Sequence, residues 1–401
     1  MATGQRGSSA DRLTVVAGSG ALLVAVFLVA LNLRTGFGSL PPMLTTIQAR
    51  LGLSDTAAGL LTTIPPLCLG VFAPLAPWLA RRWSLEAAIA MGLGLSLIGT
   101  AVRSVGGSAG LFIGTVLVGA GPAVIGVLLP QLVKDRFPDR PGAVTGAYSM
   151  ALVGGATLGA ASTYELSTGL FDGSWALGLA FWTLPVVLAL LVWAPQLRAA
   201  TPATEPPRPA VRLLRTPLAW AVTTFMGFQA LYFYVTLSWF AAILESEGVS
   251  PGRAALLLGL TNLVQIPFAL AAPVLAGRLR SQSALAAGAV GLSTAGFLGL
   301  LAAPVSGAIV WAVLLGIGQG AAIAVAMTVI VLRSPDSAST GRLSGMVQGF
   351  GYLLAATGPV LVGAVHDATG SWTAPLWLLV GLTVPGAIAG VLAGRPRQIS
   401  R

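Results

Sequence analysis

The chain is dominated by a succession of apolar stretches, each about 20 residues or longer, with short polar breaks between them. A stretch of this length crosses the hydrocarbon core of a bilayer as one helix. Helices satisfy their own backbone N–H and C=O groups in lipid, and the abundance of Gly and Ala suits close packing there. We predict an all-α membrane protein with about twelve transmembrane helices, over residues 14–40, 54–80, 85–104, 109–132, 140–163, 173–194, 217–243, 252–277, 284–303, 307–332, 342–365 and 372–393.

Composition excludes several other classes of protein. Hydrophobic residues make up 55% of the 401-residue chain and charged residues only 8%, whereas a soluble domain carries about 25% charged residues. The net charge of +10 does not indicate nucleic-acid binding, because the basic residues are scattered in ones and twos and form no cluster on one face. We expect the lipid bilayer and a small-molecule solute as partners, and no nucleic acid.

Few side chains could support chemistry. Cys68 is the only cysteine and His366 the only histidine, so neither an internal disulfide nor a structural metal site is expected. The sequence has no Gly-x-x-x-x-Gly-Lys-Ser/Thr loop, which argues against ATP-driven pumping. No acid, base and nucleophile are grouped within the predicted spans. We therefore expect no metal, no cofactor and no enzymatic activity.

The distribution of Lys and Arg predicts the orientation in the membrane. Alternate breaks carry 18 basic residues on one side, against Arg50, Arg103 and Arg253 on the other. Because cytoplasmic loops collect basic residues, both termini should be cytoplasmic in a multi-pass protein of the cell inner membrane.

A central polar stretch, 195–216, separates the first six spans from the last six. Its prolines disfavour a continuous helix and its arginines place it in the cytoplasm. We predict an N-terminal six-helix bundle over 1–194, a cytoplasmic linker over 195–216 and a C-terminal six-helix bundle over 217–401.

The two halves repeat short motifs at a nearly constant offset. APWLARR at 76–82 matches APVLAGR at 272–278 at an offset of 196, and RFPD at 136–139 matches RSPD at 333–336 at an offset of 197. Two parallel repeats around a central cavity are typical of secondary transporters.

Six plus six spans, a basic central linker and repeated cytoplasmic turns resemble the major facilitator superfamily. APWLARRW lies where that family carries Gly-x-Leu-Ala-Asp-Arg-x-Gly-Arg-Arg, but Arg81 replaces the usual Asp, and the second copy has Gly277 there. The resemblance implies the two-bundle fold with helices 1, 4, 7 and 10 lining a cavity. The departure puts gating through that Asp in doubt.

The resemblance is sharper to one branch, the cyanate and 2-nitroimidazole transporter family, and covers nearly the whole chain. It implies secondary transport of small, often anionic or flat polar molecules. Helix 4 of that family has Asn about where Gly126 stands, so selectivity can differ. The stretches that carry it are ALNLRTGFGSLPPML (30–44), GLLTTIPPLCLGVFAPLAPWLARR (59–82), LLPQLVKDRFPDRPGAVTGAYS (128–149), GIGQGAA (316–322) and GPVLVGAVHDATGSWTAPLWL (358–378).

Arg34 is the strongest candidate for a solute contact. It is the one charge that the sequence places well inside a span, where it requires water or a partner. An anionic solute could supply the partner, because a guanidinium offers a planar fork to a carboxylate-like anion. The alternative is that Arg34 snorkels to the outer interface. Asn32 is two residues away and would face nearly the opposite way on a regular helix, so it is either a second contact or an interhelical hydrogen bond.

Several uncharged polar residues are further candidates. On the seventh span Phe225, Gln229, Tyr232, Thr236 and Trp239 are spaced by four, three, four and three residues, which aligns them in one stripe. This stripe is either a cavity wall or a packed helix face. The family architecture adds Gln319 and Gln348, with helix packing as the alternative. The predicted solute-binding residues are Arg34, Asn32, Gln229, Tyr232, Gln319 and Gln348.

The two RxPD turns should lie at the cytoplasmic face. There they could brace an inward gate through Arg–Asp pairing, or simply mark the ends of helices. The candidate gating residues are Arg82, Arg136, Asp139, Arg333 and Asp336.

Together these observations favour a secondary active or facilitative transporter that works as a monomer by alternating access. It would move a small, anionic or flat polar solute across the inner membrane. Because no acidic residue lies deep in a predicted span, we expect uniport, exchange or weak proton coupling. The alternatives are a drug or nitroimidazole efflux carrier and, in another class, a non-transporting membrane sensor on a carrier fold.

Overall fold

The computed structural model describes residues 9–105, 107–198 and 213–399. All regular elements in this part of the chain are helices. They form twelve segments that are long and apolar enough to cross a membrane, as predicted. The elements are α1 (Ser9–Gly38), η1 (Pro41–Met43), α2 (Leu44–Leu51), α3 (Asp55–Phe72), η2 (Ala73–Leu75), α4 (Ala76–Arg82), α5 (Leu85–Val105), α6 (Gly107–Arg136), α7 (Pro141–Leu170), α8 (Trp175–Ala180), α9 (Thr183–Arg198), η3 (Leu213–Arg215), α10 (Pro217–Ser246), α11 (Pro251–Arg278), α12 (Ser283–Ala302), α13 (Ala308–Arg333), α14 (Ser337–Thr369) and α15 (Thr373–Ala393).

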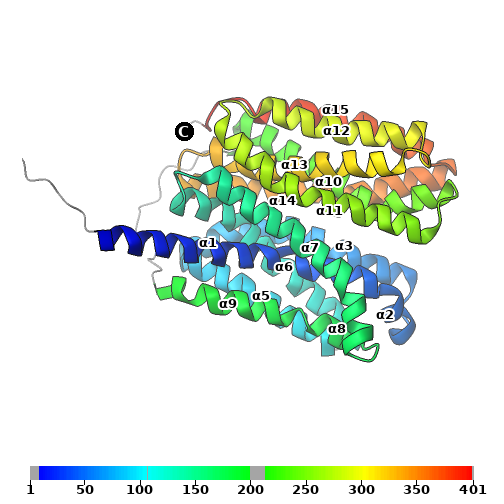
Figure 1. Cartoon of the computed structure of the whole chain (residues 1–401), viewed down its shortest axis with the longest axis horizontal. Coiled ribbons are helices and arrows are strands. Elements are labelled where there is room, and N and C mark those ends of the chain that lie inside the picture. Colours follow the sequence, from blue (N-terminus) through cyan, green and yellow to red (C-terminus); the bar gives the residue numbers. More distant parts are fainter. Residues whose placement is uncertain (1–8, 106, 199–212, 400–401) are drawn as a thin grey trace, which may run out of the picture.

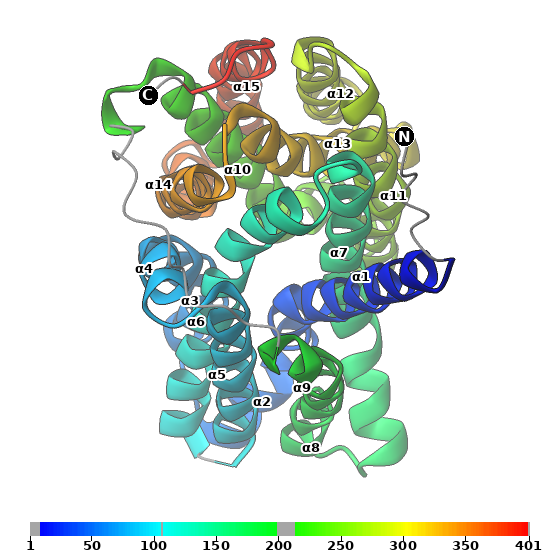
Figure 2. The same ribbon diagram turned by 90° about the vertical axis from the view of Figure 1, so that its left-hand side faces the viewer.

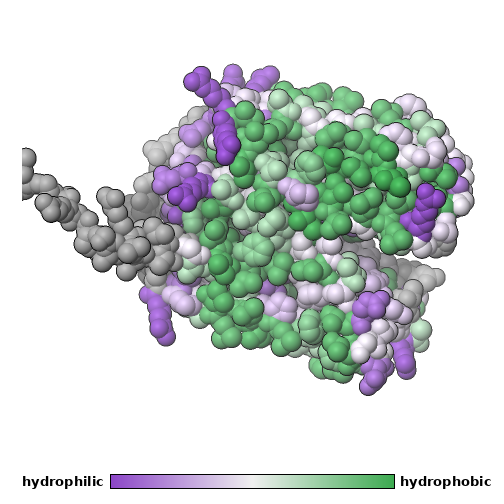
Figure 3. All heavy atoms as spheres, viewed as in Figure 1, coloured by the Kyte–Doolittle hydropathy of each residue, from purple (hydrophilic) through white to green (hydrophobic). Residues whose placement is uncertain are grey.

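The helices run roughly parallel to one long axis and form two groups (Figures 1 and 2). Helices α1–α9 make one group, here called the N-bundle, and α10–α15 make the other, the C-bundle. The start of α1 and the end of α15 lie at the same end of the molecule, which we call the termini end; the opposite end is the far end. Hydrophobic residues cover a broad band of the surface between hydrophilic residues at both ends (Figure 3), as expected for a multi-pass membrane protein.

Prolines explain where the helices depart from the predicted spans. The first span ends at Gly38, and Pro41 then begins the 3₁₀ turn η1, which leads into the short helix α2. Because Pro lacks an N–H and fixes φ, it starts such turns readily. Met43 and Ile47 are buried in a small hydrophobic cluster at the far end, together with Leu61 and Leu111. The second span is likewise built in pieces, since Pro74 and Pro77 begin η2 and α4.

Two helices extend beyond the predicted spans. Helix α7 continues to Leu170, and α14 covers Ser337–Thr369, against predictions of 140–163 and 342–365. The sequence rule detects only the apolar middle of a helix, whereas the polar turns at either end continue into the interfacial region. Asp336 caps α14 by accepting the Ser339 N–H, and Gly370 ends it in the left-handed conformation at φ +64°.

Glycines allow the two bundles to touch closely at the termini end. A Cβ added at Gly142 of α7 would lie 2.5 Å from the Pro273 carbonyl oxygen of α11, and one at Gly146 would lie 2.6 Å from the Leu270 oxygen. On the other side of the molecule Gly345 of α14 lies against Pro77. The small-residue spacing therefore serves contacts between the bundles. At the far end the surface is indented between the two groups (Figure 3).

Candidate functional site

Arg34 lies near the far end of α1 and crosses from the N-bundle to the C-bundle. Its side chain is buried, with 5% exposed, so it does not snorkel to the surface. Its Nη2 donates to the Tyr352 hydroxyl of α14 at 3.2 Å. The guanidinium carbon lies 4.9 Å from the ring centre of Phe233 of α10, within cation–π range. One charged side chain of the N-bundle therefore meets two aromatic residues of the C-bundle.

Tyrosines surround this arginine. Tyr234 of α10 lies close enough to interact electrostatically with Arg34 and Tyr352, and Tyr148 of α7 does so with Tyr352. The chain has only five tyrosines, and three of them gather here. The buried hydroxyl of Tyr148 lies near that of Thr145, and neither makes a hydrogen bond of normal geometry among the described residues. Since buried polar atoms are normally satisfied, the Tyr148 hydroxyl is a candidate to bond a polar ligand atom.

No carboxylate compensates Arg34 in the part of the chain that the structure describes. The buried charged side chains there are Arg34, Glu86, Arg103 and Arg333. Glu86 is paired with Arg136 at the termini end. The neighbours of Arg34 are a hydroxyl and an aromatic face, which favour a cation only weakly compared with an anion. The site therefore carries a net positive charge that an anionic or electron-rich solute would neutralise.

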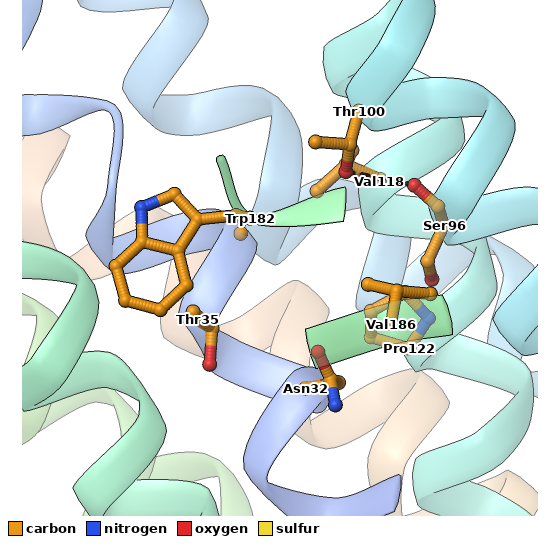
Figure 4. Close-up of a pocket in the computed structure, with 9 residues that line it drawn as sticks. Asn32, Thr35, Ser96, Thr100, Val118, Pro122, Trp182 and Val186 are labelled. Carbon is orange, nitrogen blue, oxygen red and sulfur yellow. Dashed lines mark hydrogen bonds between the residues drawn. The ribbon is translucent and has the colours of Figure 1, made fainter. Parts of the chain in front are cut away.

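Asn32 points away from Arg34, into the N-bundle. Its Nδ2 donates to the carbonyl oxygens of Leu28 and Pro185 at 2.8 and 3.1 Å, so it joins α1 to α9. Its Oδ1 is buried without a partner and borders a cavity of about 10 Å³, lined also by Ser96, Thr100 and Trp182 (Figure 4). That is about the smallest space that holds one water molecule. Of the two interpretations of Asn32, the structure favours the interhelical hydrogen bond.

The predicted stripe on α10 faces the interior of the C-bundle. The Tyr232 hydroxyl donates to the Leu382 carbonyl oxygen of α15 at 2.7 Å. Gln319 of α13 donates to Thr236 Oγ1 at 2.8 Å, and Gln229 donates to Met226 Sδ at 3.1 Å. These are packing contacts. The residues of α10 that approach Arg34 are Phe233 and Tyr234, which lie about 100° and about 200° around the helix from Tyr232 of the predicted face.

Gln348 is the predicted residue that does lie between the bundles. Its Nε2 donates to the Gly126 carbonyl oxygen of α6 at 2.8 Å and to Ser344 Oγ at 2.9 Å. A Cβ at Gly126 would lie 3.1 Å from Gln348 Oε1. The amide of Gln348 thus approaches the position where the related family has an asparagine. Gln348 and Tyr352, one turn apart on α14, present adjacent polar groups to the N-bundle.

Among the described residues, the Arg and the Asp of each RxPD turn do not form an ion pair with each other. Arg136 forms an ion pair with Glu86 of α5. Arg333 donates to Gln282, to the Ala393 oxygen at 2.9 Å and to the Gly394 oxygen at 3.0 Å. Both arginines therefore tie helices together within their own bundle.

The other predicted gating residues have different roles. Asp336 caps α14 and also interacts electrostatically with Lys134 at the end of α6, which is a contact between the bundles. Asp139 is exposed in the turn between α6 and α7. The Arg82 guanidinium lies over the ring of Trp83 at 5.8 Å.

Arg103 has a structural role that the sequence did not reveal. It was counted as a basic residue of an outer break, yet its side chain is fully buried at the far end of α5. It donates to the Gly36 carbonyl oxygen and to Ser39 Oγ, both at 2.8 Å. These bonds fix the last turn of α1, which carries Arg34. Its position at the very end of an apolar stretch gave no signal to distinguish it from an exposed loop residue.

The fold and the site define a class of protein: a polytopic membrane carrier with a charged site at the interface of two helical bundles. The model of the Major Facilitator Superfamily matches residues 22–312 and 240–401. The chain is 38% identical over 381 residues to the 2-nitroimidazole transporter of Escherichia coli (strain K12), covering 94% of this chain and 96% of the relative. It is 38% identical over 380 residues to the uncharacterized transporter YycB of Bacillus subtilis (strain 168), covering 94% of both. It is 30% identical to the cyanate transport protein CynX of E. coli, covering 94% and 97%. The chain belongs to the Major Facilitator Superfamily and is a transporter, as the resemblance implied.

Solved structures agree on the fold. The proton:xylose symporter XylE, bound to 6-bromo-6-deoxy-D-glucose, superposes with a TM-score of 0.76 at 14% identity, covering 95% of this chain and 97% of that one. FucP in the outward conformation superposes with a TM-score of 0.73 at 15% identity, covering 95% and 99%. At these identities the likeness concerns the fold alone.

Proposed function

We propose that this transporter carries a small anionic or flat, electron-rich solute, bound between the bundles by Arg34, Phe233, Tyr148, Tyr234 and Tyr352. One observation carries the proposal: a buried guanidinium at the bundle interface has aromatic and hydroxyl neighbours and no carboxylate among the described residues. The names of two relatives, which transport 2-nitroimidazole and cyanate, are consistent with this chemistry. Asn32, Tyr232 and Gln319 are not kept in the site, because they bond other helices of their own bundle, and Gln229 is not kept because its amide bonds Met226 of its own helix.

The site suggests how each group acts on the solute. The guanidinium fork of Arg34 donates two parallel hydrogen bonds to an anionic or nitro group. The Tyr148 and Tyr352 hydroxyls donate to remaining acceptors, and the Phe233 ring bounds a flat solute from one side. Since Arg34 and Tyr148 belong to the N-bundle and the others to the C-bundle, a bound solute contacts both bundles. The affinity for such a solute therefore depends on how the two bundles are placed relative to each other. Alternating access requires this dependence.

We further propose that the protein lies in the cell inner membrane with both termini in the cytoplasm and works as a monomer. The excess of basic residues at the termini end supports this orientation. The close glycine contacts at that end then make this conformation the outward-facing one. The candidate site would be reached from outside, through the indentation at the far end.

The absence of a buried carboxylate near Arg34 favours uniport or exchange over proton symport. Among the described residues Glu86 is the one buried carboxylate, and it lies at the termini end paired with Arg136. Proton relays usually use Asp, Glu or His inside the membrane. We expect uptake into proteoliposomes to depend on the solute gradient. The uptake rate should change by less than roughly twofold when a pH gradient is collapsed. Strong dependence on the pH gradient would contradict this coupling.

Binding to the purified protein tests the site. A panel of small anions, nitroimidazoles and neutral amphiphiles is added, and thermal stabilisation is recorded, because a ligand of the native state raises the unfolding temperature. Arg34→Ala should weaken binding of the active compound about 10- to 100-fold, the loss of about 1.5–3 kcal/mol for a charge-assisted hydrogen bond. Arg34→Lys should recover only part, because an ammonium lacks the planar fork.

A matched pair of tyrosines on one helix controls for nonspecific effects. Tyr148→Phe removes the unpartnered hydroxyl of the site, whereas Tyr164→Phe removes a hydroxyl from a side chain that is 48% exposed. Only the first should weaken binding. Equal responses of the native protein and Arg34→Ala would reject the site and favour Arg34 as a purely structural link.

Nitroimidazole-type efflux is the second candidate, and the aromatic wall of the site favours it. Phe233 and the three tyrosines offer ring faces to a flat heteroaromatic solute, and one relative is a 2-nitroimidazole transporter. The residues do not encode direction. Accumulation of labelled nitroimidazole in cells with and without the transporter decides it: lower accumulation with the transporter indicates export, and higher accumulation indicates uptake.

A further inference from the structure

A groove of about 490 Å³ lies between the bundles at the termini end, outside the solute site. It is lined by α3, η2 and α4 of the N-bundle and by η3 and α14 of the C-bundle. Helices α4 and α14 lie side by side at that end (Figure 2). The lining residues used below are Arg81, Arg342, Trp78, Leu214, Phe350 and Leu353.

The groove is positively charged at one end and apolar along its length. Among the described residues that line it, Arg81 and Arg342 are charged and none is a carboxylate. The buried Nε of Arg342 has no hydrogen-bond partner among the described residues. Arg81 is exposed. Each bundle thus contributes one guanidinium to the same opening, and that of Arg342 donates from Nη2 to Ser339 Oγ at 3.4 Å.

The apolar part continues from this opening toward the middle of the membrane. Trp78 and Phe350 are 52% and 47% exposed, and Leu214 is 62% exposed. Leu353 lies eleven residues beyond Arg342 on α14, which is about 16 Å along a helix. Trp220 holds one rim in place: its Nε1 donates to the Leu214 oxygen at 2.9 Å and its ring packs on Phe350 at 5.4 Å.

We propose that this groove binds an anionic phospholipid of the adjacent leaflet. Its phosphate would lie between Arg81 and Arg342, and an acyl chain would lie along Trp78, Phe350 and Leu353. The charges favour an anionic headgroup over a zwitterionic one, since no acidic side chain lines the groove to receive a headgroup ammonium. A lipid is favoured over a free anion, because the apolar length of the groove would otherwise stay unfilled.

The position of the groove gives the lipid a consequence for transport. Arg81 belongs to the N-bundle and Arg342 to the C-bundle, so one phosphate bound by both links the bundles at the end where they already touch. The lipid therefore stabilises the conformation that is closed at the termini end. Separation of the bundles at this end, as alternating access requires, would break one of the two contacts.

Lipid binding to the full-length protein in detergent tests the proposal. Phosphatidylglycerol and phosphatidylcholine with identical acyl chains are compared by native mass spectrometry and thermal stabilisation, with inorganic phosphate as a third ligand. Phosphatidylglycerol should bind about 30-fold more tightly to the native protein than to Arg81→Gln/Arg342→Gln, from about fivefold for each basic residue near a membrane surface. Phosphatidylcholine carries the same phosphate, but the arginines repel its ammonium, so its affinity should differ much less between the two proteins.

A control variant separates this groove from general surface charge. Arg395→Gln/Arg397→Gln removes two exposed arginines at the same end but outside the groove, and should bind phosphatidylglycerol like the native protein. Equal loss in the control would reject the groove as the site. Equal stabilisation by inorganic phosphate would reject the lipid in favour of a free anion. If the groove variant misfolds, Arg81→Lys/Arg342→Lys keeps the charge and should retain selectivity for phosphatidylglycerol; loss of selectivity in that folded variant overturns the proposal.

Discussion

At the termini end of each bundle one arginine joins the ends of neighbouring helices, but its acceptors differ. In the N-bundle Arg136 at the end of α6 pairs with the Glu86 carboxylate of α5, and Trp193 of α9 donates separately to the Glu86 backbone carbonyl oxygen at 3.0 Å. In the C-bundle Arg333 at the end of α13 bonds Gln282 before α12 and two carbonyl oxygens after α15. The positions of the two arginines differ by 197 residues, and those of Glu86 and Gln282 by 196.

The far ends of the bundles show a second difference at equivalent positions. In the N-bundle the backbone and Cβ of Arg103 lie against Gly114, between α5 and α6. In the C-bundle Gly299 takes the place of Arg103, and Trp311 takes the place of Gly114 and covers it. The large and small residues have changed places, at offsets of 196 and 197 residues. In both bundles this helix contact consists of one large and one small residue. The helix that carries the large residue differs between the bundles.

The comparison teaches that helix geometry is shared and that polar chemistry is local to each bundle. The largest expected effect tests this at the termini end. Arg333→Met removes donors to three buried acceptors and should cost about 4 kcal/mol or more, since hydrogen bonds to charged groups contribute about 1.5–3 kcal/mol each. Arg136 is 36% exposed and meets one buried carboxylate, so Arg136→Met should cost only about 1–3 kcal/mol. Unfolding in detergent measures both, and equal losses would contradict the difference between the bundles.

The far end gives a smaller expected effect. Arg103→Met removes the charged donor from Ser39 Oγ and from the Gly36 oxygen, which keeps only its bond from Ser39 Oγ at 3.1 Å, and should cost about 3 kcal/mol. Trp311→Phe loses one neutral hydrogen bond, from Nε1 to the Ala303 oxygen at 2.9 Å, and should cost about 1 kcal/mol. Because Arg103 also fixes the last turn of α1, its loss should weaken solute binding at Arg34. Unchanged binding in a folded Arg103→Met protein would show that α1 holds its end without this support.

Contacts between the bundles can be weakened without touching either bundle's own hydrogen bonds. Gly142→Leu places a side chain against the Pro273 oxygen, and overpacking costs about 1–3 kcal/mol. We expect the closed termini end to open, with about a tenfold gain in labelling of a cysteine introduced there, equivalent to about 1.4 kcal/mol. Gly154→Leu on the same helix meets open space and should leave the labelling unchanged. The same gain from both variants would place the effect on α7 itself.

The smallest effect should come from making the two arginine sites alike. Glu86→Gln gives the N-bundle the amide acceptor that the C-bundle already uses, and should cost less than about 1 kcal/mol, because Arg136 keeps an acceptor and the cost of burying the carboxylate charge is removed. Unfolding of this variant across ionic strength provides the check, because the remaining salt dependence of the Arg136 contact should disappear. A loss comparable to that of Arg136→Met would show that the charge on Glu86 is essential.

The fold was largely predictable because lipid imposes one simple rule on the chain. Each apolar stretch must become a helix, so the twelve spans could be located before any contact was known. The break at Pro74, inside the predicted span 54–80, was missed, because proline also occurs inside unbroken helices, as Pro65 and Pro66 do in α3. The family was likewise recognisable from motifs that lie in continuous segments of the chain.

The candidate site was predictable only where a single residue stood out. Arg34 was identified because a charge inside a span is costly wherever it points. The uncharged candidates were not separable from packing residues by spacing alone: Tyr232 and Tyr234 are both tyrosines of α10, yet one faces α15 and the other faces Arg34. A rotation of 100° for each residue sets the face, and only the position of the neighbouring helices decides which face is the cavity.

The sequence by itself determined the number of membrane-spanning segments, the superfamily and the presence of a cation, Arg34, within the membrane. These depend on composition and local hydrophobicity, which each segment carries independently of the others. The tertiary structure decided that Arg34 meets Phe233 and Tyr352, that Arg103 supports α1, and that glycines of α7 and α14 close one end. Those contacts join residues far apart in the chain, and their partners are fixed by how twelve similar helices pack, which no single helix specifies.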